Sequence, residues 1–273
     1  GVHSINIKNK DFKWTTDFNI SWNRNKIEKL ASDITLGASG RNASILREGY
    51  SVNSFYLYKQ LYVDPQTGNA VYDAGEDGII TSADRQVVGN ALPKYTGGLT
   101  NEISYKDFSL NLFFYFQQGN KILSMHDFFL VHGGTQNNIG FIPRQLERWQ
   151  NPGDITDIPR LTTYSGDPTV NGGSANNYGG NVANLSSRYL SDGSFIRLKN
   201  VALGYNVPKS ITKSLSLSKL RASVSVTNLF TITKYKGLDP EVSAQSSDQN
   251  TQGYDWATVP QPRTFQLTLN ATF

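Results

Sequence analysis

The chain has 273 residues, of which 38% are hydrophobic, 12% aromatic and 18% charged, and its formal net charge is +4. It is too aromatic for a disordered chain, and its lack of cysteine excludes disulfide frameworks, Cys-zinc sites and thiol nucleophiles. The basic residues are scattered along the chain, which argues against nucleic-acid binding. No apolar run approaches the ~18 residues of a transmembrane helix, whereas a spanning β-barrel alternates polar and apolar residues and is not excluded.

The first strong pattern covers residues 12–22, after a weaker strand candidate at residues 2–8. Its even positions carry Phe12, Trp14, Phe18, Ile20 and Trp22, with a threonine between them, and all its odd positions are polar. Because successive side chains of a strand point to opposite faces, this alternation predicts a strand with one apolar and one polar face.

Further segments repeat this alternation along the chain. They are residues 98–105, 108–117, 200–207, 220–227 and 264–273, together with a weaker candidate at 54–63. The segments predict about eight strands of an all-β protein.

The connections between these strands differ greatly in length. Residues 106–107 and 208–218 are short, and Pro208 can begin one helical turn, whereas residues 118–190 and 230–260 are long and rich in Gly, Asn and Ser. A short packing helix is expected at residues 143–150, with Leu146 and Trp149 on one side. Short turns at one end and long loops at the other are typical of transmembrane barrels.

The apolar face of the predicted strands is aromatic at both strand ends, as in the girdles of membrane barrels. The opposite face carries Asn, Thr, Ser, Gln and Gly, which suits a water-filled lumen. The residues expected to face lipid are Phe12, Trp14, Phe18, Ile20, Trp22, Phe108, Leu110, Leu112, Phe114, Phe116, Val201, Leu203, Tyr205, Val224, Val226, Phe265, Leu267 and Leu269.

Two other readings fit the alternation. A soluble carbohydrate-binding β-sandwich also buries one face of each strand and wets the other. Eight strands can also close into a small barrel of their own.

Four blocks of the sequence resemble one family in order and spacing. Residues 194–208 read SFIRLKNVALGYNVP and residues 228–241 read NLFTITKYKGLDPE, and both are similar to strand motifs of the SusC/RagA type of TonB-linked outer-membrane proteins. Residues 148–154 (RWQNPGD) with 158–161 (IPRL), and residues 12–26, match two more blocks.

The resemblance implies that residues 1–273 are the C-terminal portion of a 22-stranded transmembrane β-barrel in the outer membrane of a Gram-negative bacterium. The family's plug domain, TonB box and earlier strands would lie upstream, and no signal peptide is recognised at the start of the chain. The terminal Phe273 resembles the signal read by the assembly machinery of that membrane.

The resemblance also implies a function and partners. Members of this family import oligosaccharides or peptides, drawing energy from the TonB complex through the plug. A SusD-like lipoprotein covers their outer loops, and the assembly would be a dimer of transporter–lipoprotein pairs.

A candidate calcium loop covers residues 73–84. Asp73, Asp77, Thr81 and Asp84 stand where a 12-residue calcium loop supplies oxygen ligands, and a glycine occupies its sixth position. Gly75 removes one ligand and Asp84 replaces the usual Glu, so the alternative is an acidic turn. In either case Arg85 could pair with one of the carboxylates. Calcium is the one cofactor considered.

No pattern indicates catalysis, and no enzyme is expected. Asp239 and Glu241 could be written as a glycosidase pair, but loop spacing does not fix the carboxyl separation which that chemistry needs. The three histidines are too few and too separated for a convincing metal site. Several loop aromatics could stack on sugars or simply pack on each other: Phe128, Phe129, Phe141, Trp149, Tyr164, Tyr178 and Trp256.

Overall fold

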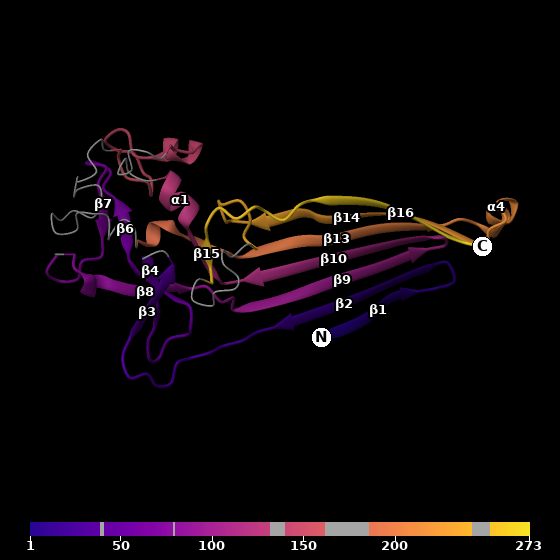
Figure 1. Ribbon diagram of the computed structural model, residues 1–273, viewed down its shortest axis with the longest axis horizontal. Coiled ribbons are helices and arrows are strands. Elements are labelled where there is room, and N and C mark those ends of the chain that lie inside the picture. The colour runs from indigo at the N-terminus through magenta and orange to yellow at the C-terminus, as the bar shows by residue number, and fades with distance from the viewer. Residues whose placement is uncertain (39–40, 79, 132–139, 162–185, 242–251) are drawn as a thin grey trace.

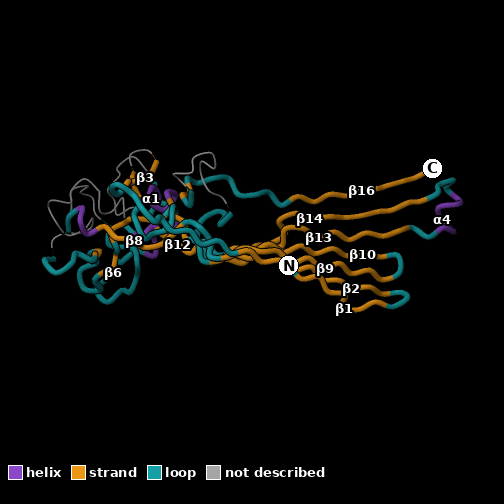
Figure 2. Tube along the Cα trace, turned by 90° about the horizontal axis from the view of Figure 1, so that it is seen from below, coloured by secondary structure: helices purple, strands orange, loops and turns teal. Residues whose placement is uncertain are grey.

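The computed structural model describes residues 1–38, 41–78, 80–131, 140–161, 186–241 and 252–273. One long sheet extends along the molecule, with its strands aligned along the long axis. A body of smaller sheets and loops continues beyond one end of it (Figures 1 and 2). The ends of the long sheet are named here the loop end, next to this body, and the turn end. The body itself is named the loop body.

The long sheet is antiparallel throughout and has seven strands in the order β1-β2-β9-β10-β13-β14-β16. Its strands are β1 (Val2–Lys8), β2 (Phe12–Ser21), β9 (Tyr95–Tyr105), β10 (Phe108–Gln118), β13 (Phe195–Asn206), β14 (Lys219–Thr233) and β16 (Thr264–Thr272). Their positions confirm seven of the predicted strands. The sheet is open, with β1 and β16 at its edges, so the described residues do not form a closed barrel of their own.

Strands β13 and β14 are longer than the alternation predicts. The register shifts at Lys199, where β13 carries an extra residue relative to β10, and again where β14 passes Asn228. Asn228 has a positive φ of 53°. After each bulge, the residues that face the apolar side change from odd to even numbers or the reverse. A search for strict alternation therefore does not detect the rest of the strand.

Residues 54–63 are not a strand of the long sheet, which corrects the prediction of about eight strands. They form β5 (Ser54–Tyr58) and β6 (Gln60–Val63) of the loop body. In β5, Phe55 and Leu57 are fully buried and Tyr58 nearly so, so this strand is held by the core of the loop body rather than by one face of a large sheet.

The connections divide by length as predicted. Residues 9–11, 106–107 and 207–218 join strands at the turn end, and the last of these contains the helix α4 (Lys209–Ser214) directly after Pro208. Lys106 adopts a φ of 50°, which a tight two-residue hairpin requires. Residues 22–94, 119–194 and 234–263 connect strands at the loop end (Figure 1).

The loop body contains the hydrophobic core of the chain. Phe55, Leu57, Leu123, Met125 and Tyr254 are among its fully buried residues. Its elements are β3 (Ile34–Ala38), β4 (Arg41–Leu46), β7 (Ala70–Tyr72), η1 (Ser82–Asp84), β8 (Arg85–Asn90), β11 (Lys121–Ser124), α1 (Met125–Leu130), η2 (Pro143–Glu147), η4 (Ser187–Tyr189), β12 (Leu190–Asp192) and β15 (Tyr254–Asp255). The loop body continues the molecule lengthwise and does not cover the long sheet as the second layer of a sandwich would (Figure 2).

The helix expected at residues 143–150 is shorter than predicted. Only the 3-10 turn η2 forms, and Leu146 on it is 69% exposed. Trp149 lies beyond the turn, and its indole N–H donates to the carbonyl of Pro65 at 2.8 Å. Gly68 leaves the room in which this indole packs. Among the described residues, no helix is both long and apolar enough to cross a membrane.

Candidate functional site: the two faces of the long sheet

The pairing register places the predicted lipid-facing residues on one face of the long sheet, here the apolar face. Phe108 pairs with Tyr205, Leu110 with Leu203 and Leu112 with Val201, and the same rows continue into the neighbouring strands. Trp22 alone lies outside the strands, directly after β2, and is 69% exposed. The strand residues of this set therefore share one face, and the contact of that face with lipid stays a prediction.

The apolar face is largely uncovered in this chain. On β16, Phe265, Leu267 and Leu269 are 69%, 70% and 66% exposed. The rings of Phe18 and Phe116 stack at 6.2 Å between centroids across Gly97, where a Cβ would overlap the Phe116 ring. A continuous apolar surface of this kind marks a contact with lipid or protein rather than with water.

Thr16 and Asn101 are polar residues on this face, and their side chains are hydrogen-bonded to each other. The Oδ1 atom of Asn101 accepts hydrogen bonds from the Trp14 indole at 3.0 Å and from the Thr16 hydroxyl at 2.8 Å. A polar group without such a partner would be costly in an apolar surrounding.

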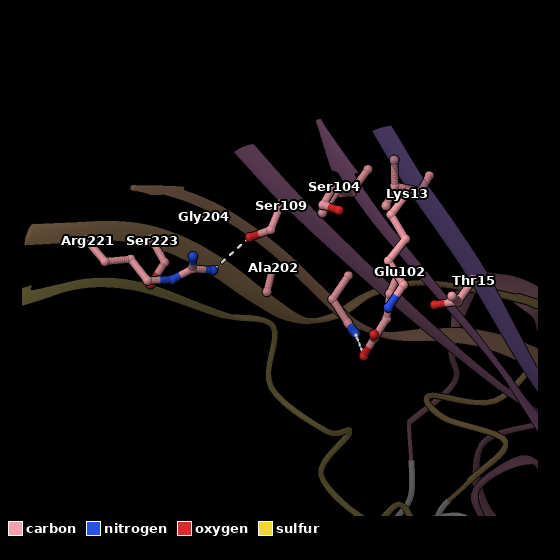
Figure 3. A pocket seen from close by; sticks show the side chains of 12 residues that line it. Lys13, Thr15, Glu102, Ser104, Ser109, Ala202, Gly204, Arg221 and Ser223 are labelled. Atoms are coloured by element: carbon pink, nitrogen blue, oxygen red, sulfur yellow. Dashed lines mark hydrogen bonds between the residues drawn. The ribbon is translucent and has the colours of Figure 1, made fainter. Parts of the chain in front are cut away.

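The opposite, polar face contains a cavity of about 380 Å³ near the turn end (Figure 3). Side chains from five neighbouring strands line it, among them Lys13, Glu102, Ser109, Asn111 and Arg221. The Asn111 amide donates weakly to Glu102 at 3.4 Å. This face presents both charges and several hydroxyls and amides, as expected for a surface that water or a polar solute contacts.

Arg221 reaches across the polar face. Its guanidinium donates to the Ser109 hydroxyl at 2.7 Å (Figure 3). It also donates to the Asn206 side chain at 2.9 Å. It lies over Gly204, where a Cβ would overlap it. A glycine on β13 thus allows a side chain of β14 to reach β10.

At the loop end of the polar face, four charged side chains form a cluster here named the clamp: Arg197, Lys199, Asp239 and Glu241. Arg197 donates to the carboxylate of Asp239 and, at 2.6 Å, to that of Glu241. Lys199 donates to both carboxylate oxygens of Glu241, at 2.5 and 2.7 Å. The clamp ties the segment that follows β14 back onto β13.

Asp239 is only 3% exposed, and its environment favours the ionised form. Burial acts to raise its pKa, but hydrogen bonds from Arg197 and from the backbone N–H groups of Glu241 and Gln261 outweigh that effect and lower the pKa below its usual range. Because Asp239 and Glu241 both accept hydrogen bonds from Arg197, we interpret them as structural residues that hold this loop in place.

A second buried contact joins two described residues of this loop. The Tyr235 hydroxyl donates to Asp255 on β15 at 2.5 Å. Burial, together with the carboxylate of Asp255, raises the pKa of Tyr235 far above its usual range, so the phenol stays protonated. Trp256 packs against Phe129 of α1, and Phe128 packs against both Phe129 and Tyr189.

The candidate calcium residues do not gather around one point. Asp84 accepts hydrogen bonds from the backbone N–H and the hydroxyl of Thr81, at 2.5 and 3.0 Å, and so caps η1. Asp73 accepts from Gln86 at 3.1 Å and lies 3.9 Å from the Lys59 ammonium. In the described part of the chain, no three Asp, Glu or His residues lie close enough to hold a metal ion. Calcium binding at Asp73, Asp77, Thr81 and Asp84 stays a prediction.

Arg85 forms different contacts from those expected. It donates to the backbone carbonyls of Tyr56 and Asn42 and lies over the Tyr56 ring at 4.4 Å. It is drawn into the loop body because strands β5 and β8 pair there, placing Tyr58 opposite Arg85.

The remaining predicted residues fall into three groups. Phe128, Phe129, Trp149 and Trp256 pack within the loop body, whereas Phe141 is half exposed. Phe273 is 93% exposed at the turn end, beyond β16. Tyr164, Tyr178 and His132 lie outside the described residues.

Sequence reasoning did not single out Arg197, Arg221 and Gly204. Arg221 and Gly204 stand at polar positions of the alternation, and Arg197 lies beyond the bulge at Lys199. Their contacts join residues far apart in the sequence, so the pattern of one strand does not reveal them.

No family model matches the chain. It is 34% identical over its full length to the TonB-dependent receptor P3 of Formosa agariphila and 28% identical over 99% of its length to the TonB-dependent receptor SusC of Bacteroides thetaiotaomicron. The chain spans 28% and 26% of the lengths of these relatives.

The fold is similar to solved structures as well. A structure of the RagAB peptide transporter superposes with a TM-score of 0.76, and the RagAB peptide importer in its open-open state with 0.75. Both share 24% sequence identity and cover 99% of this chain, which is 28% of the length of theirs. The long sheet is therefore a section of an antiparallel transmembrane β-barrel.

These barrels form the class of TonB-dependent receptors. The chain belongs to its SusC/RagA family, whose members lie in the outer membrane of Gram-negative bacteria.

Proposed function

We propose that residues 1–273 form the C-terminal part of the wall of a TonB-dependent importer, with the apolar face toward lipid and the polar face toward the lumen. The observation that carries the proposal is the register of the seven strands, which separates an exposed apolar face from a polar face rich in hydroxyls and amides. The plug domain, the TonB box and the earlier strands would be supplied by the rest of the receptor.

The whole receptor imports an oligosaccharide or a peptide in this proposal. The similarity to the RagAB peptide transporter supports a peptide as one such nutrient. A SusD-like lipoprotein would cover the loop end, the TonB complex would act through the plug, and the assembly would be a dimer of transporter–lipoprotein pairs. The chain itself has no catalytic role in the proposal.

The long loops would contact the lipoprotein or the nutrient, namely residues 118–190 and 230–260. This follows from their place at the loop end, opposite the short turns. The clamp holds the start of the second loop, so that a change further along it leaves the barrel wall in place.

The test replaces residues 162–185 or 242–251 in the complete receptor with Gly-Ser segments of equal length. We expect either replacement to reduce both uptake of the nutrient and co-purification of the lipoprotein, with an unchanged amount of receptor in the outer membrane. A matched control replaces residues 209–214 of α4 at the turn end and should leave lipoprotein binding intact. Unchanged uptake and unchanged lipoprotein binding in both loop variants would contradict this role.

A further inference from the structure

A second cavity, of about 550 Å³, lies at the loop end of the long sheet and is named here the basic cavity. Its wall includes Asn23, Arg24 and Asn25, which follow Trp22 after β2. Lys94 directly precedes β9, and Gly119 directly follows β10. Ser54 of β5 and Gly89 and Asn90 of β8 contribute the side toward the loop body. The cavity thus opens where the barrel wall meets the outer loops.

Its charge distinguishes it from the other cavities described. Arg24, Lys94 and Lys121 line it, and no aspartate or glutamate does. The cavity on the polar face contains Glu102, and two further cavities, at α4 and beside β6, contain Asp107 and Asp157. The basic cavity is therefore the one among these four in which positive charge is not balanced by a carboxylate of its own wall.

Two of the three cationic side chains, those of Lys94 and Lys121, pack directly against glycines. A Cβ at Gly119 would lie 2.7 Å from Cγ of Lys94, and one at Gly89 would lie 2.8 Å from Cγ of Lys121. Gly119 also has a φ of +86°, a conformation that favours glycine. The lysine stems are thereby held against the backbone, which limits the positions their ammonium groups can take.

Within the described residues, Arg24 and Lys94 can bind a ligand because no ion pair occupies them. Lys121 pairs in register with Asp192 of β12. Within the described residues, Arg24 and Lys94 have no ion-pair partner and both are exposed. The side chains of Asn23 and Tyr50 also line the cavity, and an amide and a phenol can donate to an oxygen of a ligand.

We propose that the basic cavity binds an oxyanion, a carboxylate, sulfate or phosphate group, on a molecule that reaches the outer end of the barrel. The cations of Arg24 and Lys94 would supply charge-assisted hydrogen bonds, and Asn23 and Tyr50 would supply neutral ones. The oxyanion belongs either to an acidic nutrient or to the phosphate of an outer-leaflet lipid. The first source rests on the proposed import function, and the second does not.

The test uses the complete receptor in detergent, with hexagalacturonate as the acidic probe and its methyl ester as the neutral control. We expect calorimetry to show at least tenfold tighter binding of the acid at low salt. Arg24→Gln combined with Lys94→Gln should remove that preference, and added salt should weaken it. Lys213→Gln, which removes a cation of α4 at the turn end, should leave the preference unchanged.

A parallel arm measures the lipid phosphate that co-purifies with each variant. Loss of the probe preference in the double variant supports the site with a solute as its ligand, and loss of bound lipid phosphate supports it with a lipid as its ligand. No difference between the double variant and the wild type in either arm would overturn the proposal, as would an equal loss in Lys213→Gln.

An uptake assay in cells separates this proposal from the function proposed above. A receptor that shows the charge preference in detergent and transports nothing would overturn import and leave the oxyanion site standing. A receptor that transports its nutrient equally well with and without the two cations, and shows no preference in either arm, would overturn the site and leave import standing.

Discussion

The guanidinium of Arg221 on β14 lies over Gly204 of β13 and donates to Ser109 on β10, the strand beyond β13. Three strands of the barrel wall are therefore joined on the polar face by one side chain. Any residue larger than glycine at position 204 would meet the guanidinium, because its Cβ would point to the same face.

Gly204→Ala should destabilise the barrel by about 1–3 kcal/mol, since it forces Arg221 out of its place. Heat-modifiable mobility of the complete receptor on gels measures the loss of barrel structure with temperature. The double variant Gly204→Ala with Arg221→Ala should recover part of the loss, because the clash is gone. A double variant no better than the sum of its single changes would contradict the contact.

The face assignment predicts opposite outcomes for two neighbouring residues of β10. Leu112→Arg should impair assembly in the outer membrane, because an arginine facing the middle of the bilayer costs about 2–4 kcal/mol. Asn111→Arg should be tolerated, since its side chain lies on the polar face. The amount of folded receptor in the outer membrane measures both. Equal behaviour of the two variants would show that the assignment is wrong.

We expect the loop that the clamp holds to lose stability in acid. The folded pKa of Asp239 is below the ~3.9 of an unfolded aspartate, so its carboxylate stabilises the loop above that pH and this contribution is lost as the pH falls through the folded pKa. Hydrogen exchange of the peptides containing Glu241 and Gln261, corrected for the intrinsic rate, should show protection at pH 7 that declines toward pH 3.

Asp239→Asn should remove that protection already at pH 7, because it leaves the buried Arg197 with one carboxylate fewer, at a cost of about 3 kcal/mol. Asp154→Asn is the control, since the Asp154 carboxylate also accepts two backbone N–H groups but lies in another loop. Full protection of both peptides in Asp239→Asn would contradict the clamp.

Calcium binding at residues 73–84 can be tested with terbium, which replaces calcium and luminesces when bound. Terbium luminescence of the complete receptor should appear on titration and be lost in Asp73→Asn and in Asp77→Asn if residues 73–84 bind calcium. Chelation should then also lower the melting temperature of the loop body. Luminescence that is absent, or that persists in both variants, would leave these residues as an acidic turn capped by Thr81 and Asp84.

The terminal residue carries a prediction of the family resemblance. Deletion of Phe273, or Phe273→Ala, should reduce the amount of receptor inserted in the outer membrane and leave its synthesis unchanged. Leu215→Ala, at another exposed apolar residue of the turn end, is the matched control. Normal insertion without Phe273 would remove it as an assembly signal.

The sequence was sufficient for the parts of the fold that depend on local alternation. The apolar rows of β2, β10 and β16 follow directly from period-two patterning, because a strand fixes the face of every second residue. The bulges at Lys199 and Asn228 broke that period, and so the start of β13 and the end of β14 were missed. Residues 54–63 were misassigned because a buried strand of a small sheet and a barrel strand both read as apolar runs.

The clamp and the Arg221 contact could not be read from the sequence. Arg197 and Asp239 are 42 positions apart, and Ser109 and Arg221 are 112 apart, so only the pairing of β10, β13 and β14 brings them together. The calcium prediction treated residues 73–84 as a free loop, whereas Asp84 caps η1 and Asp73 faces Lys59 and Gln86.

The central claim is that this chain is part of the wall of an outer-membrane importer, and the native protein tests it most directly. An antibody against the C-terminal peptide should detect a species far larger than 30.3 kDa that leaves the outer-membrane fraction only in detergent. A soluble species of 30.3 kDa, extracted without detergent, would contradict the claim.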